Sequence, residues 1–303
     1  MELRFILAFI PWLFWWFVNI FDKIFIERYL KNIFSFYFFY NIISPLVLIL
    51  FLFIFNFEFI SYKYIIIVFL GSISYFLTNA FYVKALENDE VSKVVPLYSL
   101  TVIFVLLYDI FLFKENIKLV SMLWMALVVI WSMLLLSKDL SFNILRPRKA
   151  LFYMIFSSFA WSLVFVFTKI FIEKYQFWTL LIYQLFFQII ICISFLFFKK
   201  SRSQIFDTYK NIQTRSPYFC IWFSSILDFI ALFTLQFVLT IWIASYVNVI
   251  AQVQHVFVLI FSSILSIFFP NILKEKLDRS IFLKKLYFII LIIIWIVFIK
   301  FNS

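Results

Sequence analysis

The 303-residue chain is 66% hydrophobic and only 14% charged, and its mean hydropathy is +1.08. Soluble domains carry about 25% charged residues, so this composition excludes a soluble globular protein and indicates an integral membrane protein. The net charge of +11 does not indicate binding to nucleic acid. The basic residues lie in short links between apolar segments, where the rules of membrane orientation account for them.

Ten apolar segments are long enough to cross a bilayer as helices, which takes about 20 residues. They are 4–22, 33–55, 64–86, 91–113, 117–137, 150–172, 177–198, 218–240, 244–269 and 281–301. The first has one basic residue before it and no small-residue cleavage site after it, so we expect a membrane span and not a removable signal peptide. The predicted fold class is an all-α integral membrane protein with ten transmembrane helices.

An internal repeat divides the chain into two halves. Residues 15–29 return as residues 161–175 with nine of fifteen positions identical, and residues 92–104 align with 245–257. We therefore predict two five-helix domains, 1–140 and 147–303. Because five is odd, the second must enter the membrane inverted relative to the first, an arrangement that places a binding site near the midplane.

The basic residues also predict an orientation. Nineteen of the 26 Lys and Arg residues fall on the side of the link between the first two spans, and seven fall on the opposite side. The positive-inside rule then places both termini outside. The long link 199–217 has Ile205, Phe206, Tyr209 and Ile212 at helical spacing among basic residues. This pattern favours an amphipathic helix at the membrane interface, with a solvated loop as the alternative.

Several motifs resemble those of EamA-type carriers in the drug/metabolite transporter superfamily. They are the run 81–86 (FYVKAL), Ser92, the run 95–97 (VPL), the run 113–115 (FKE), and the Trp-to-Lys opening of each half. The resemblance implies a central cavity lined by spans 1, 3, 4, 6, 8 and 9. Two features depart from the family. Only Gly71 remains of its many packing glycines, so Ser and Ala must provide close helix contacts, and family members generally place both termini in the cytoplasm.

Polar side chains within the predicted spans are the candidates for a solute site, because they tend to face a cavity. Ser72, Tyr75, Asn79 and Tyr82 share one face of the third span, and Ser245, Asn248, Gln252 and His255 share one face of the ninth. The alternative is that these groups only join helices by hydrogen bonds. The predicted substrate-binding residues are Trp15, Tyr75, Asn79, Tyr82, Tyr98, Trp161, Asp228, Asn248, Gln252 and His255.

Two of these candidates carry a further hypothesis. Asp228, in the middle of the eighth span, must be paired, hydrated or protonated, so it can bind a substrate cation or a coupling proton. A structural hydrogen bond is the alternative. His255, the only histidine, can shuttle protons or hold a helix interface. Asp109, near the end of the fourth span, is expected to be an interfacial anchor.

The expected function is secondary transport of a small organic metabolite, amino-acid-like or drug-like, outward across the plasma or inner membrane by alternating access. The cargo class and the export direction come from the resemblance. The alternatives are a nucleotide-sugar or sugar-phosphate exchanger, and a lipid-linked sugar flippase component or non-transporting scaffold. We expect no enzyme activity, cofactor, metal or nucleic acid. The expected partners are the solute, the bilayer and a coupling proton or counter-substrate, with the protein acting as a monomer or homodimer.

Overall fold

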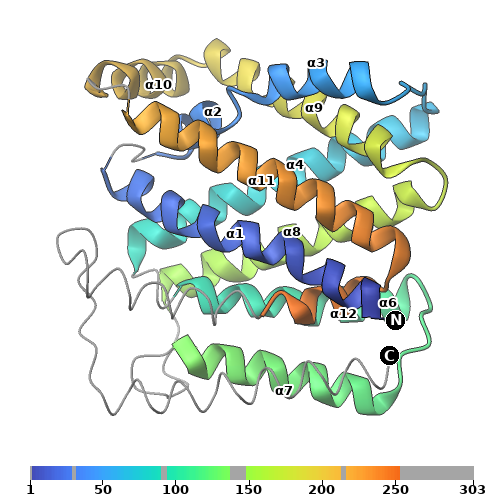
Figure 1. The fold of residues 1–303 in the computed structure, drawn as a ribbon. Coiled ribbons are helices and arrows are strands. Elements are labelled where there is room, and N and C mark those ends of the chain that lie inside the picture. The colour runs from blue at the N-terminus through green and yellow to red at the C-terminus, as the bar shows by residue number, and fades with distance from the viewer. Residues whose placement is uncertain (1, 29–31, 90–93, 137–147, 213–215, 253–303) are drawn as a thin grey trace.

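The computed structural model describes residues 2–28, 32–89, 94–136, 148–212 and 216–252 (Figure 1). In this part of the chain every regular element is a helix. The elements are α1 (Glu2–Arg28), α2 (Ile33–Tyr40), α3 (Ser44–Ile54), α4 (Tyr62–Asn88), the 3-10 helix η1 (Val95–Ser99), α6 (Leu100–Phe111), α7 (Leu119–Leu136), α8 (Lys149–Ile172), α9 (Phe177–Phe197), α10 (Lys199–Asn211), α11 (Ser216–Ile241) and α12 (Ala244–Ile250).

These helices coincide with the first eight predicted spans and with the beginning of the ninth. Five helical segments are long and apolar enough to cross a membrane: Ile33–Ile54, Tyr62–Asn88, Lys149–Ile172, Phe177–Phe197 and Pro217–Ile241. The prediction of a helical, multi-pass membrane protein is confirmed. The tenth span and most of the ninth lie outside the described residues, so ten spans in two inverted domains remain a prediction.

The second predicted span is divided between α2 and α3 by a polar turn. The Asn41 side-chain amide donates to the Tyr37 carbonyl at 2.9 Å, and the Ser44 hydroxyl contacts the Asn41 side-chain oxygen at 3.4 Å. Pro45 then begins α3, where a proline removes no helical hydrogen bond. Asn41 and Ser44 are buried and are hydrogen bonded within the turn, so it can lie within an apolar surrounding.

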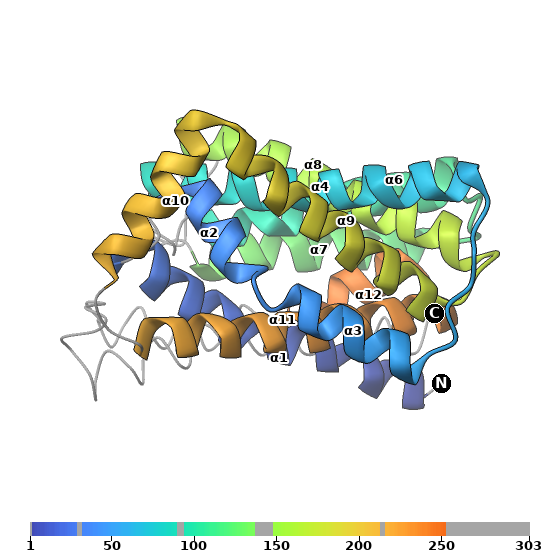
Figure 2. The ribbon, with the colours of Figure 1, turned by 90° about the horizontal axis from the view of Figure 1, so that it is seen from above.

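The most extensive helix contacts are between α4 and α8 and between α1 and α11. Both pairs are antiparallel. Tyr64 contacts Phe171 while Phe81 contacts Tyr153, near the opposite ends of α4 and α8. Figure 2 shows α1 and α11 along one face of the molecule and α4 and α8 along the opposite face.

The predicted repeat relates these pairs to one another. It makes α1 equivalent to α8 and α4 equivalent to α11, so exchanging the halves converts the α1–α11 contact into the α8–α4 contact. In Figure 1, α1 and α8 run in opposite directions. The opposite directions of α1 and α8 agree with this expectation, and the inverted repeat itself stays a prediction.

Serine replaces glycine at the closest helix contacts, as the sequence predicted. Ser157 and Ser158 on α8 are fully buried, and their hydroxyls donate to the carbonyls of Thr78 (2.9 Å) and Leu97 (3.1 Å) in the first half. Gly71 faces Phe167, whose Cβ would lie 3.4 Å from an added Cβ. Small side chains thus let α4 and α8 approach closely.

The outer surface carries large apolar side chains. Phe53 on α3 is 86% exposed, Phe152 and Phe156 on α8 are more than half exposed, and Phe186 on α9 is 49% exposed. A soluble protein rarely exposes so much contiguous apolar area. These side chains are suited to contact lipid.

The link 199–217 contains a helix, α10, so the first of the two alternatives is correct for residues 199–211. The four apolar residues of the pattern do not share one environment. Ile205 and Ile212 are buried, together with Thr208, but Phe206 and Tyr209 are 52% and 60% exposed. Thr208 donates to the Ser35 hydroxyl at 2.8 Å, so the helix is docked against α2 through a polar contact.

Candidate functional site

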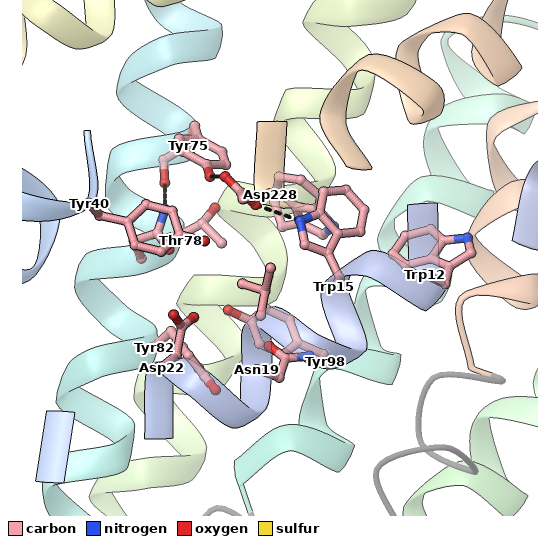
Figure 3. A pocket seen from close by; sticks show the side chains of 13 residues that line it. Trp12, Trp15, Asn19, Asp22, Tyr40, Tyr75, Thr78, Tyr82, Tyr98 and Asp228 are labelled. Atoms are coloured by element: carbon pink, nitrogen blue, oxygen red, sulfur yellow. Dashed lines mark hydrogen bonds between the residues drawn. The ribbon is translucent and has the colours of Figure 1, made fainter. Parts of the chain in front are cut away.

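A cavity of about 90 Å³ lies between the α1–α11 pair and the α4–α8 pair (Figure 3). A water molecule needs roughly 10–15 Å³ on this measure, so the cavity can hold several waters or a small solute. Its lining consists of Trp12, Trp15, Val18, Asn19, Asp22, Tyr40, Tyr75, Thr78, Asn79, Tyr82, Tyr98, Trp161 and Asp228.

Asp228 on α11 is the centre of the hydrogen bonding in this cavity. Its Oδ1 accepts from the indole Nε1 of Trp15 on α1 at 2.6 Å, and its Oδ2 accepts from the hydroxyl of Tyr75 on α4 at 2.7 Å (Figure 3). Only 8% of Asp228 is exposed. A carboxylate is costly at such a place, and these two short donor contacts compensate part of that cost.

The aromatic residues of the two halves meet beside this carboxylate. Trp15 and Trp161 lie edge to face with ring centroids 5.5 Å apart, and Trp161 lies 6.0 Å from the Tyr75 ring. Trp15 and Trp161 are equivalent in the repeat. The alignment of 92–104 with 245–257, extended backwards, also makes Tyr75 equivalent to Asp228. The cluster therefore consists of two pairs of equivalent positions, one member from each half.

Asp22 is a second buried carboxylate in the cavity, and the sequence analysis did not select it. It is 6% exposed, and its Oδ1 has no hydrogen-bond partner among the described residues. Trp12, Trp15, Asn19 and Asp22 follow 3-4-3 spacing along α1, the rhythm that identified the stripes on the third and ninth spans. The same test applied to the first span would have found it.

The acidic and basic residues of the lining are all of one kind, acidic. It contains two carboxylates and no Lys, Arg or His among the residues that the structure describes. The side chain of Asn79 is neutral, and its amide donates to the Tyr75 carbonyl one turn earlier at 3.0 Å. The cavity is thus acidic and aromatic.

Lys169, a basic residue within the predicted sixth span, does not line the cavity and belongs to a separate ion cluster. Its Nζ contacts Asp109 Oδ1 at 3.1 Å and Glu115 Oε1 at 2.7 Å, and it lies 4.3 Å from the centroid of the Phe113 ring. Asp109 is fully buried, and its Oδ2 accepts from the Ser245 backbone N–H at 2.7 Å. The expectation of an interfacial anchor was therefore wrong, because Asp109 joins the halves inside the protein.

Residues 3–137 match the family model of the EamA-like transporter family. This region belongs to the drug/metabolite transporter superfamily. The resemblance seen in the sequence is confirmed for residues 3–137. A comparison with curated proteins gives no match.

The EamA-like region supplies every lining residue except Trp161 and Asp228. Of the spans that the resemblance implied, the first, third, fourth, sixth and eighth contribute to the cavity. The second span, which was not expected, adds Tyr40. The cavity thus lies between helices of the EamA-like region and the helices α8 and α11 that follow it.

Seven of the ten predicted site residues line this one cavity. They are Trp15, Tyr75, Asn79, Tyr82, Tyr98, Trp161 and Asp228. Asn248 and Gln252 are buried but do not line it, and their amides donate to carbonyls one turn earlier at 3.3 and 3.2 Å. His255 lies outside the described residues, so its role stays a prediction.

Proposed function

We propose that this EamA-like protein is a secondary carrier that moves a small organic solute, amino-acid-like or drug-like, outward by alternating access. The two halves would rock about the cavity. The coupling partner would be a proton or a counter-substrate, and the protein would act in the plasma or inner membrane as a monomer or homodimer. The basic residues favour both termini outside.

One observation carries this proposal. Asp228 of the second half is held by Trp15 and Tyr75 of the first half, at the wall of a cavity to which both halves contribute. A solute that competes for this carboxylate would loosen a contact between the halves. Binding would then be coupled to their relative motion, which alternating access requires.

The ion cluster supports the same mechanism. Lys169 of the second half contacts Asp109 and Glu115 of the first, at the end of the molecule where Phe5 meets Trp242. The cavity lies toward the other end, beyond the Trp15–Trp161 contact, where Asp22 and Tyr98 are found. Asp89 of the first half and Arg148 of the second form an ion pair near the other ends of α4 and α8, so charged contacts between the halves lie at both ends, and alternating access would break them in turn.

The alternative functions have less support. A nucleotide-sugar or sugar-phosphate exchanger needs cationic groups to compensate phosphate, and the cavity presents two carboxylates instead. A scaffold or a flippase component does not need a buried polar cluster across the junction of the halves. The EamA family is generally non-enzymatic, which supports the expectation that this protein catalyses no reaction.

Cysteine accessibility tests the proposal without knowledge of the solute. In a background with Cys192→Ala and Cys220→Ala, Asn79→Cys places a thiol on the cavity wall. Right-side-out and inside-out vesicles are then treated with a membrane-impermeant methanethiosulfonate reagent. We expect modification from both sides. Phe186→Cys on α9 is the control, because its half-exposed side chain on the lipid-facing surface should react from neither side.

Modification of Asn79→Cys from a single side only, under every condition of pH and ionic gradient, would contradict alternating access and favour a scaffold. The orientation of the vesicles that react faster also tests the predicted position of the termini.

A further inference from the structure

We propose that the cavity selects small organic amines in their cationic form, in preference to amino acids and carboxylic acids. This inference rests on the proposed function, since it names the class of solute that the same site would carry. The proposed class of solute is narrower than the amino-acid-like or drug-like metabolites that the family resemblance suggests. It follows from the charge, shape and aromatic content of the lining.

The first argument is charge. Asp22 and Asp228 are both more than nine-tenths buried, and both face the cavity (Figure 3). Buried charges are paired in stable proteins, yet no basic side chain of the described chain lines this space. Trp15 and Tyr75 satisfy Asp228 with neutral donors, and Asp22 Oδ1 has no partner among the described residues. An ammonium group would supply the missing positive charge.

The second argument is the aromatic wall. Three tryptophans and four tyrosines line the cavity, and an ammonium ion is attracted to the face of such rings, most strongly to tryptophan. Trp12, Trp15 and Trp161 can therefore stabilise the head of an amine and also contact its apolar body. Aromatic rings would give no comparable attraction to a phosphate or a carboxylate.

The third argument concerns the carboxylate of an amino acid. A zwitterion needs donors for its acidic end as well as acceptors for its amine. Neutral donors are present in the lining, since the Trp12 indole N–H and the Tyr82 hydroxyl have no hydrogen-bond partner among the described residues, but none of them carries a positive charge. Placing a second negative charge beside Asp22 and Asp228 without a cation is unfavourable. The cavity should thus discriminate against amino acids.

The size of the cavity limits the amine. Its volume of about 90 Å³, divided by the roughly 10–15 Å³ that one water occupies on the same measure, leaves room for about six to nine non-hydrogen atoms. Isoamylamine fits within this range. Leucine is the same molecule with an added carboxylate, and 4-methylpentanoate is leucine without its amine, so the three share one apolar body and differ in charge.

Isothermal titration calorimetry on the purified full-length protein in nanodiscs tests the selection with these three probes. We expect the affinity to decrease from isoamylamine to leucine, and no detectable binding of 4-methylpentanoate. Asp22→Asn and Asp228→Asn should each weaken isoamylamine binding by at least about tenfold. Asp228→Glu, which keeps the charge, should retain binding. Asp207→Asn removes an exposed acid of α10 that contacts only Ser203 in the described residues and should change nothing.

Thermal unfolding of each variant shows whether a loss of binding reflects a loss of fold. Isoamylamine binding that persists in the Asp22→Asn/Asp228→Asn double variant would overturn the inference. Tighter binding of leucine or 4-methylpentanoate, or binding of none of the three, would also overturn it. The cysteine-accessibility experiment needs no ligand. If Asn79→Cys still reacts from both sides when the amine fails to bind, the carrier function stands and only the assignment of its solute is wrong.

Discussion

Removal of the Lys169 ammonium group should destabilise the protein substantially. In Lys169→Met, Asp109 would lose its ion pair while remaining fully buried. Removing one partner of a buried ion pair typically costs about 3–5 kcal/mol. We expect the lower end, about 3 kcal/mol, because the Ser245 N–H still donates to Asp109. Glu115, the second acid, is 30% exposed at its side chain and can be hydrated.

The assay is the free energy of unfolding in mixed micelles, measured by titration with SDS. Lys174→Met is the matched control. Lys174 lies five residues later, is exposed, and has only a contact with the Tyr64 ring, 5.5 Å from the centroid, among the described interactions. Its removal should change the free energy of unfolding by less than about 1 kcal/mol.

A double-mutant cycle isolates the pair itself. Lys169→Met/Asp109→Asn removes both charges, so the double variant should be destabilised by at least about 1–2 kcal/mol less than the sum of the two single variants. Additivity within about 0.5 kcal/mol would refute the reasoning, because it would mean that the two side chains do not interact in the membrane.

Two further predictions concern packing. Gly71→Leu places a large side chain where an added Cβ already meets Phe167 at 3.4 Å, so overpacking should cost about 1–3 kcal/mol in the same titration, whereas Gly71→Ala should be tolerated. Thr208→Val removes the hydroxyl bond to Ser35 at 2.8 Å and should destabilise the docking of α10 by about 1 kcal/mol, seen as faster proteolysis of residues 199–211 in vesicles. Unchanged proteolysis would show that the hydroxyl bond contributes nothing to docking.

The helices could be predicted from the sequence because one physical quantity, the thickness of the bilayer, fixes their length. The interruption at Asn41 could not, since it depends on a side-chain amide that adds a second hydrogen bond to the Tyr37 carbonyl at the end of α2. Periodicity predicted the helix α10 but not which of its apolar side chains pack on the protein. Ile205 is buried, whereas Phe206 and Tyr209 are exposed, because an aromatic residue is also stable at a membrane interface.

The sequence identified most of the predicted residues that line the cavity, but it did not identify the contacts between them. Helical spacing found Tyr75, and isolation in an apolar segment found Asp228, yet neither observation shows that the two side chains are hydrogen bonded. Asp22 was overlooked because it lies at the end of its predicted span, where an acid is ordinarily hydrated. The structure places it inside, since the described α1 continues to residue 28 and carries Asp22 beyond the expected boundary.

The predicted repeat makes Tyr75 and Asp228 equivalent positions, so their contact can be compared with the contact that two identical halves would form. If the halves were identical, symmetry would place two like side chains against each other at the axis, either two phenols or two carboxylates. Two carboxylates at hydrogen-bond distance repel unless they share a proton. A tyrosine in one half and an aspartate in the other instead form a donor–acceptor pair at 2.7 Å. This contact between the halves thus carries one carboxylate, that of Asp228, and a cation bound in the cavity beside it would contact residues of both halves.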